Sequence, residues 1–191
     1  MDFLVCSRAT QAARTAEDEP GLNERHWSYM DGFADAMIAR GPTLGPDRET
    51  WTGSLHVVGL PGPDEAQAFV QNEPYQQAGL FEEHLVRGFT NLLGRTMWQF
   101  EGRAGEPRFL VLAHATGSAV PGPVAPDDLP PRLREGLVVY GQLLGPDGRP
   151  AGMALAVQVP DRETLDGLLA DPRTRLAGHL EVHDWEFGGR R

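Results

Sequence analysis

The chain has 191 residues, enough for one domain or two small ones. Its 40% hydrophobic and 23% charged residues are typical of a globular protein and exclude collagen, coiled coils and wholesale disorder. The net charge of −10 repels phosphate backbones and anionic lipids, so we expect no nucleic-acid and no membrane partner.

The first half of the chain alternates predicted strands and helices. An apolar strand is expected at residues 2–8, followed by a helix over residues 23–40 with Asn23 as its N-cap. Gly41 and Pro42 are expected to end this helix. The elements predicted after it are a short strand from Thr43, a strand at 51–60, a helix from Pro63 that ends at Glu73 and Pro74, and a strand at 84–89. This is a β-α-β-β-α-β order.

The second half repeats this plan. Residues 41–47 return as residues 141–147 with five of the seven positions identical, and other segments match in kind in the same order. The first helix of the second half is expected to be shorter, near residues 131–140. Residues 101–106 are polar and contain Gly, which predicts a linker between domains 1–100 and 107–191.

A β-α-β-β-α-β unit is typical of the ferredoxin-like fold, an antiparallel sheet with both helices on one face. The second sheet face of each unit must also be covered. We therefore predict an α+β fold in which two tandem ferredoxin-like domains pack sheet to sheet as an intramolecular dimeric α/β barrel. The sequence leaves open whether the whole chain also forms a homodimer.

Several short motifs resemble the YciI-like, or YCII-related, family. They are Arg25-His26, the segment at residues 41–46, Glu73-Pro74-Tyr75 and Ala78-Gly79. The resemblance covers residues 1–92 well and residues 107–187 weakly. It implies a dimeric α/β-barrel fold, in single or tandem domains, with a paired histidine and aspartate that serve an enzymatic function.

The family resemblance assigns its paired residues to two positions of this chain. The histidine falls on His26, and the aspartate falls on Glu73, a departure by one methylene. In the second half Asp171 keeps a carboxylate, but no histidine stands at the position that corresponds to His26. The second domain is therefore interpreted as a degenerate copy, and one site per chain is expected.

Topology supports the same pairing without the resemblance. His26 is predicted in the first turn of one helix and Glu73 at the end of the other, and both ends lie at the same edge of the sheet. Glu73 could hold one imidazole nitrogen and leave the other as a general base. Arg25, Tyr29 and Tyr75 are expected to bind a substrate oxygen nearby. A surface histidine and an ordinary Glu-Pro helix end would explain the same residues.

A second polar pattern occurs near the end of the chain. His179, Glu181 and His183 alternate, so a strand would place them on one face. Two imidazoles and a carboxylate suit zinc or iron, but no further ligand is evident, and we predict no metal. The simpler interpretation is a final strand with Leu180 and Val182 packed inward.

The sequence predicts no cofactor. All 17 basic residues are arginine, which excludes Schiff-base and P-loop lysine chemistry, and no Gly-x-Gly-x-x-Gly follows a predicted strand. The single cysteine, Cys6, lies in an apolar strand and is expected to be an inert core thiol. The N-terminal residues do not resemble a signal peptide, and a cytoplasmic location is expected.

Two functions follow from these observations. The first is a cofactor-independent enzyme that uses a His–carboxylate pair for isomerisation, elimination or hydrolysis of a small organic molecule, for example in secondary metabolism. The alternative is a non-catalytic small-molecule-binding or accessory protein of the same fold, which the Asp-to-Glu change at Glu73 favours. A cavity that holds His26 and Glu73 within hydrogen-bond distance would favour the enzyme.

Overall fold

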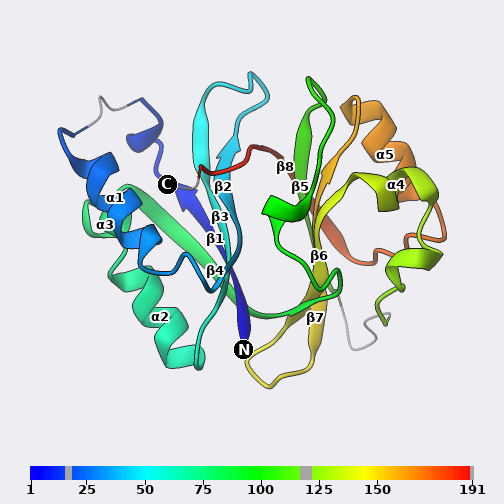
Figure 1. Ribbon diagram of the computed structural model, residues 1–191, viewed down its shortest axis with the longest axis horizontal. Helices are drawn as coiled ribbons and strands as arrows, with labels where there is room; N and C mark the ends of the chain where they lie inside the picture. The colour runs from blue at the N-terminus through cyan, green and yellow to red at the C-terminus, as the bar shows by residue number, and fades with distance from the viewer. Residues whose placement is uncertain (16–18, 117–121, 190–191) are drawn as a thin grey trace.

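The computed structural model describes residues 1–15, 19–116 and 122–189. They form a mixed α+β fold whose eight strands close into one antiparallel barrel, in the order β1-β3-β2-β8-β5-β7-β6-β4. The helices lie outside the barrel in two groups, one on each side (Figure 1). None of the helices in the described part of the chain is long and apolar enough to cross a membrane.

The first half of the chain supplies four neighbouring strands and three helices. The strands stand in the order β4-β1-β3-β2, with β1 paired antiparallel to both β3 and β4. The elements are β1 (Asp2–Ala9), α1 (Leu22–Asp31), β2 (Met37–Leu44), β3 (Trp51–Gly59), α2 (Pro63–Gln71), α3 (Pro74–Gln77) and β4 (Phe81–Asn91).

The second half supplies the other four strands. They stand in the order β8-β5-β7-β6, and β5 pairs antiparallel with both β7 and β8, as β1 does with β3 and β4. The elements are β5 (Arg108–His114), α4 (Pro131–Gly136), β6 (Leu137–Leu144), β7 (Pro150–Gln158), α5 (Arg162–Ala170) and β8 (His179–Trp185). Short 3₁₀ turns occur at Ala13–Thr15, Met97–Gln99 and Pro126–Asp128.

Two seams join the halves into a closed barrel. At one seam β2 meets β8 through only two residue pairs, Thr43 with Trp185 and Leu44 with Asp184. At the other seam β4 pairs with β6 over residues 88–91 and 141–144. The barrel interior is filled by side chains from both halves, among them Leu4, Leu55, Val57, Phe89, Leu110, Leu112, Leu143, Ala156 and Trp185.

Alternation along the strands divides the remaining apolar residues between two outer clusters. Leu4 points into the barrel, whereas its neighbours Phe3 and Val5 pack outward against residues of α1 and α2. The outer face of the second half packs in the same way beneath α4 and α5, through Leu133 and Leu165. Each group of helices therefore covers the outer surface of four strands.

The helix predicted over residues 23–40 is wrong at its C-terminal end. Helix α1 ends at Asp31, and Met37 already belongs to β2, where it pairs with Val58. Met30 and Met37 face the same hydrophobic cluster, so their spacing along the chain resembled that of one longer helix. Gly41 consequently lies inside a strand instead of ending a helix.

Three other boundaries also differ from the predictions. The N-cap of α1 is Gly21, with φ of 78°, and Asn23 lies in the first turn. Helix α4 ends at Gly136, because the apolar residues that follow belong to β6. Glu73 does not end α2; it is the N-cap of the separate short helix α3.

Candidate active site

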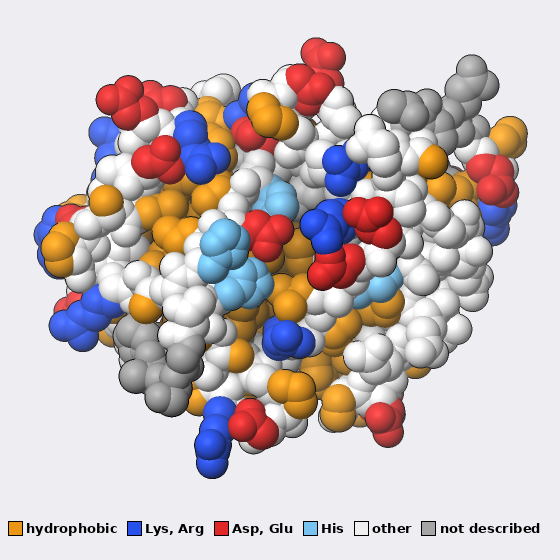
Figure 2. Space-filling view, turned by 180° about the vertical axis from the view of Figure 1, so that it is seen from behind, with side chains coloured by type: hydrophobic (Ala, Val, Ile, Leu, Met, Phe, Trp, Pro, Cys, Tyr) orange, Lys and Arg blue, Asp and Glu red, His pale blue; other side chains and the backbone are white. Residues whose placement is uncertain are grey.

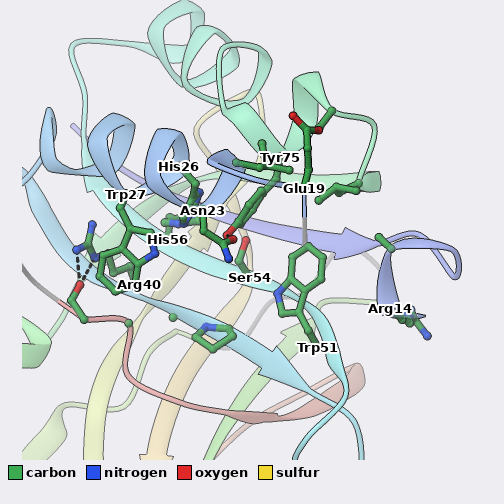
Figure 3. A pocket seen from close by; sticks show the side chains of 18 of the residues that line it. Arg14, Glu19, Asn23, His26, Trp27, Arg40, Trp51, Ser54, His56 and Tyr75 are labelled. Carbon is green, nitrogen blue, oxygen red and sulfur yellow. Dashed lines mark hydrogen bonds between the residues drawn. The ribbon is translucent and has the colours of Figure 1, made fainter. Parts of the chain in front are cut away.

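A cavity of about 520 Å³ lies between α1 and the outer surface of β2 and β3. This volume is within the usual range of small-molecule sites. Figure 3 shows Trp27 and Trp51 on opposite sides of His26, His56, Ser54 and Tyr75, with Arg14 beyond Trp51. The lining comes from the segment before α1 (Ala13, Arg14, Glu19), α1 (Leu22, Asn23, His26, Trp27), β2 (Arg40, Gly41, Pro42), β3 and the residues before it (Glu49, Thr50, Trp51, Ser54, His56), α3 and the residues after it (Tyr75, Ala78, Leu80), and residues after β8 (Gly188, Gly189).

The structure brings His26 and Glu73 together at this cavity. Nδ1 of His26 and Oε1 of Glu73 are 2.6 Å apart and form a hydrogen bond. The other carboxylate oxygen, Oε2, accepts the backbone N–H of Gln76 at 2.8 Å as the N-cap of α3. Glu73 is 4% exposed, so backbone and packing fix its orientation and thereby the orientation of the imidazole.

Tyr75 supports the same imidazole from its face. The two rings stack with their centroids 4.2 Å apart and their planes 9° from parallel. The Tyr75 hydroxyl donates a hydrogen bond to Oδ1 of Asn23, which connects α3 to the first turn of α1. His26 is therefore held at Nδ1 by Glu73 and across its ring by Tyr75, and Nε2 remains for a ligand.

The structure places Arg25 and Tyr29 elsewhere. Arg25 forms an ion pair of 2.8 Å with Glu19, and its side chain is 54% exposed. The Tyr29 hydroxyl donates to the carbonyl of Phe69, inside the apolar cluster beneath α1 and α2. Among the described residues the cavity is lined by Tyr75 but not by Arg25 or Tyr29.

His56 is a cavity residue that sequence reasoning did not select. It lies on β3, is 4% exposed, and its ring centroid is 6.3 Å from that of His26. Burial, with added repulsion from His26 and Arg40, lowers the pKa of His56 to about 3, so its imidazole is neutral at neutral pH. Its position two residues after Ser54 was the available signal, because alternation puts both residues on one face of β3.

The free energy of unfolding is expected to fall by about 2 kcal/mol between pH 7 and pH 5 because of His56. In the unfolded chain this imidazole binds a proton near pH 6.5, whereas in the folded protein it does so only near pH 3. The free energy of unfolding is therefore highest above pH 6.5 and falls progressively as the pH drops from 6.5 toward 3. Urea unfolding of wild type and His56→Leu at both pH values measures it. The wild-type decrease should exceed that of the variant by this amount. Equal decreases would contradict the prediction. His84, whose pKa burial also lowers, remains in both proteins.

The last described residues of the chain form another wall of the cavity. We call residues 186–189 the C-terminal strap, which crosses from β8 to the first half of the molecule (Figure 1). Its backbone N–H groups at Glu186 and Gly188 donate to the carbonyls of Pro42 (3.1 Å) and Arg40 (2.8 Å) on β2. The side chain of Arg40 donates in return to the carbonyl of Gly189.

Close backbone packing explains the small residues beneath the C-terminal strap. A Cβ atom at Gly41 would overlap the carbonyl of Glu186, and one at Gly189 would contact the Trp27 ring. The Arg40 guanidinium also lies 5.6 Å from the centre of the Trp27 ring. The second half of the chain therefore contributes directly to a cavity built mainly by the first half.

The polar residues of β8 face a second cavity of about 870 Å³ near an opening of the barrel. Glu181 bonds to Nε2 of His114 at 3.3 Å and to Nε2 of His183 at 2.9 Å. Figure 2 shows histidine side chains gathered beside acidic and basic groups on one face of the molecule. Within the described ranges, no group of three or more His, Cys, Asp or Glu side chains is arranged to hold a metal ion.

The predicted packing of β8 is wrong in its direction. Glu181 and His183 lie opposite the inward-facing Leu112 and Leu110, whereas Val182 packs in the outer cluster of the second half and Leu180 is exposed. The twist of a closed barrel leaves its opening accessible to solvent, which permits polar side chains on the inner face there.

Two further residues that the sequence analysis named, Cys6 and Asp171, do not line the first cavity, which contains His26. Burial raises the pKa of the Cys6 thiol to about 12, which keeps it protonated at neutral pH. Asp171 forms a surface ion pair of 2.7 Å with Arg173, whose hydrogen bonds lower the pKa of its carboxyl to about 2.

The sequence model of the YCII-related domain matches residues 1–90. No curated protein matches the sequence. The 5-chloro-2-hydroxyhydroquinone dehydrochlorinase from Burkholderia phenoliruptrix AC1100, solved with 2,5-dihydroxybenzoquinone, is 28% identical over 46% of this chain and 92% of its own, with a TM-score of 0.36.

Two other solved structures align with nearly the whole chain. A "putative monooxygenase" from Lactobacillus acidophilus is 8% identical over 97% of this chain and 93% of its own, with a TM-score of 0.47. A "putative chlorite dismutase" is 10% identical over 97% of this chain and 94% of its own, with a TM-score of 0.52. The last likeness shows that the mixed α+β fold with a large antiparallel sheet recurs over almost the full length.

Proposed function

We propose that this chain is a cofactor-independent enzyme acting on a small organic molecule, with His26 as general acid and base; the match of residues 1–90 to the YCII-related domain supports this. The observation that carries the proposal is the 2.6 Å bond between His26 and Glu73 in the wall of a 520 Å³ cavity. A base fixed by a buried carboxylate, with one nitrogen left for the ligand, is the arrangement that proton transfer requires.

The mechanism begins with Glu73 accepting the Nδ1–H of His26, which fixes the tautomer in which Nε2 carries the lone pair. Nε2 then removes a proton from the substrate, and Glu73 stabilises the imidazolium that results. Return of the proton to another atom completes an isomerisation, and departure of a leaving group completes an elimination. In a hydrolysis the proton comes from water instead.

Glu73 acts in this proposal as a positioning residue. Glu73→Gln keeps a carbonyl oxygen for the N–H of Gln76 but removes the negative charge beside His26. We expect kcat/KM to fall on the order of 10²-fold, with a changed pH profile, because the imidazolium loses its stabilising charge. The measurement uses a substrate found by thermal-shift screening of small metabolites.

The control is Glu65→Gln, which removes an exposed carboxylate from the first turn of α2. It should leave both the rate and the pH profile unchanged. If Glu73→Gln reduced stability yet kept the wild-type pH profile of kcat/KM, Glu73 would have only a structural function.

We also propose that residues 1–100 and 107–191 are tandem copies, with the second copy degenerate. Their strand orders, β4-β1-β3-β2 and β8-β5-β7-β6, correspond strand for strand, which supports the proposal. Asp171 binds Arg173 where Glu73 binds His26, which supports one His–carboxylate site per chain.

A further inference from the structure

Ser54 carries a buried hydroxyl in the wall of the cavity that has no hydrogen-bond partner among the described residues. Ser54 is 7% exposed, and its Oγ makes no hydrogen bond with any residue that the structure describes. Buried polar groups are nearly always hydrogen-bonded, because leaving one unpaired costs free energy. A ligand oxygen in the cavity would supply the missing partner.

His56 extends this polar wall along the same strand. Residues 54 and 56 share the outer face of β3, roughly 7 Å apart along the strand. The imidazole contacts the rings of His26 and Phe69. One wall of the cavity therefore presents three neighbouring polar groups, namely the hydroxyl of Ser54 and the imidazoles of His56 and His26.

The charge state of this wall selects the type of ligand. A neutral imidazole and a hydroxyl each offer one donor and at least one acceptor, but no net charge. Two arginines line the cavity: Arg40 directs its guanidinium to the carbonyl of Gly189 and to Trp27, and Arg14 donates to the carbonyl of Ala9. The carboxylates of Glu19 and Glu49 also belong to the lining and disfavour an anion. The wall thus suits a hydroxyl or carbonyl oxygen better than a carboxylate or phosphate.

The shape of the cavity adds a second restriction. Trp27 and Trp51 stand on opposite sides of its polar wall, and the Tyr75–His26 stack adds a further aromatic surface (Figure 3). Aromatic walls of this kind bind flat rings through stacked and edge-to-face contacts. Pro42 and Leu80 complete the apolar part of the lining.

We infer that Ser54 and His56 form a neutral oxygen-binding subsite, and that the substrate class is an uncharged, planar, hydroxylated ring. One ring oxygen binds between Ser54 and His56 while the reacting proton faces Nε2 of His26. This inference rests on the proposed function for the reaction, but binding to the subsite can be measured without turnover.

The test uses resorcinol, an uncharged planar diol, as the probe in isothermal titration calorimetry. Wild type should bind resorcinol at least about tenfold more tightly than 3-hydroxybenzoate, which carries a charge, or cyclohexane-1,3-diol, which is not planar. Ser54→Ala should weaken resorcinol binding by about 5- to 10-fold, as expected for one lost hydrogen bond. Failure of wild type to bind resorcinol, or equal affinity in Ser54→Ala, would overturn the inference.

Ser7→Ala is the matched control, because Ser7 is also a buried serine but bonds to Nδ1 of His84 at 2.8 Å outside this cavity. It should leave resorcinol affinity unchanged. Without ligand, Ser7→Ala should lower Tm by about 2–4 °C, whereas Ser54→Ala should leave Tm unchanged or raise it, because its hydroxyl has no partner to lose. A Tm loss in Ser54→Ala equal to that in Ser7→Ala would contradict the unpaired state of Ser54.

The two proposals fail separately. Ser54-dependent binding of resorcinol together with unchanged turnover in a His26 variant would retain the subsite and refute the acid–base function. Loss of turnover in that variant together with preference for 3-hydroxybenzoate would retain the acid–base function and refute the substrate class.

Discussion

Replacing His26 with alanine is expected to lower kcat/KM by about 10²- to 10⁴-fold, the usual contribution of a positioned general acid or base. The loss should appear mainly in kcat, because the cavity keeps Ser54, His56 and its aromatic walls for binding the substrate. Steady-state kinetics on the substrate found by screening measures it. Added imidazole should restore part of the rate, because the alanine leaves space beside Glu73.

His179→Ala is the control for this experiment, since His179 is exposed on β8 in the other half of the chain. It should retain wild-type kinetics. Turnover that survived unchanged in His26→Ala would remove His26 from the chemistry and leave the chain a binding protein. Reduced activity that imidazole could not restore, with an altered near-UV spectrum, would indicate a structural function instead.

Replacing Trp185 with alanine is expected to cost about 3–5 kcal/mol of the free energy of unfolding, as for other large aromatic side chains in a core. Trp185 is 0% exposed, packs in the barrel interior, and belongs to one of only two residue pairs that join β2 to β8. The alanine would leave a cavity next to the weakest seam. Urea unfolding at pH 7 measures the loss.

Trp185→Phe provides the comparison. The indole Nε1 is buried without a hydrogen-bond partner among the described residues, so phenylalanine loses volume but no hydrogen bond. We expect a cost below about 1.5 kcal/mol, typical of a substitution that nearly conserves shape. If both variants lost the same small amount, Trp185 would not fill the barrel as described.

Topology explains why the His26–Glu73 contact could be anticipated from the sequence. Helix order and the antiparallel sheet bring the start of α1 near the end of α2, whatever the exact boundaries. The error at Glu73 shows how little the boundary matters, because the N-cap of α3 lies at the same edge of the sheet. A periodic pattern reports which residues share a face, and it cannot distinguish one long helix from a helix followed by a strand when Met30 and Met37 face one cluster.

The face of each strand was harder to predict. His56 and Glu181 both alternate with apolar neighbours, but His56 points outward beneath α1 and Glu181 points inward at the barrel opening. Which face of a strand points into the barrel depends on how the two halves pair to close it, and a local sequence pattern carries no information about that pairing. The C-terminal strap depends in addition on contacts between residues 148 positions apart in the chain, Arg40 and Gly188.

The strap makes the two halves inseparable in a practical sense. A fragment that ended at residue 100 would keep His26, Glu73 and His56, yet it would lack the wall that Gly188 and Gly189 form against Arg40. Two separate polypeptides would have to meet to complete the cavity, so occupancy would fall on dilution. In a single polypeptide the C-terminal strap is covalently attached and is therefore present at a high effective concentration. Completion of the cavity then does not depend on protein concentration.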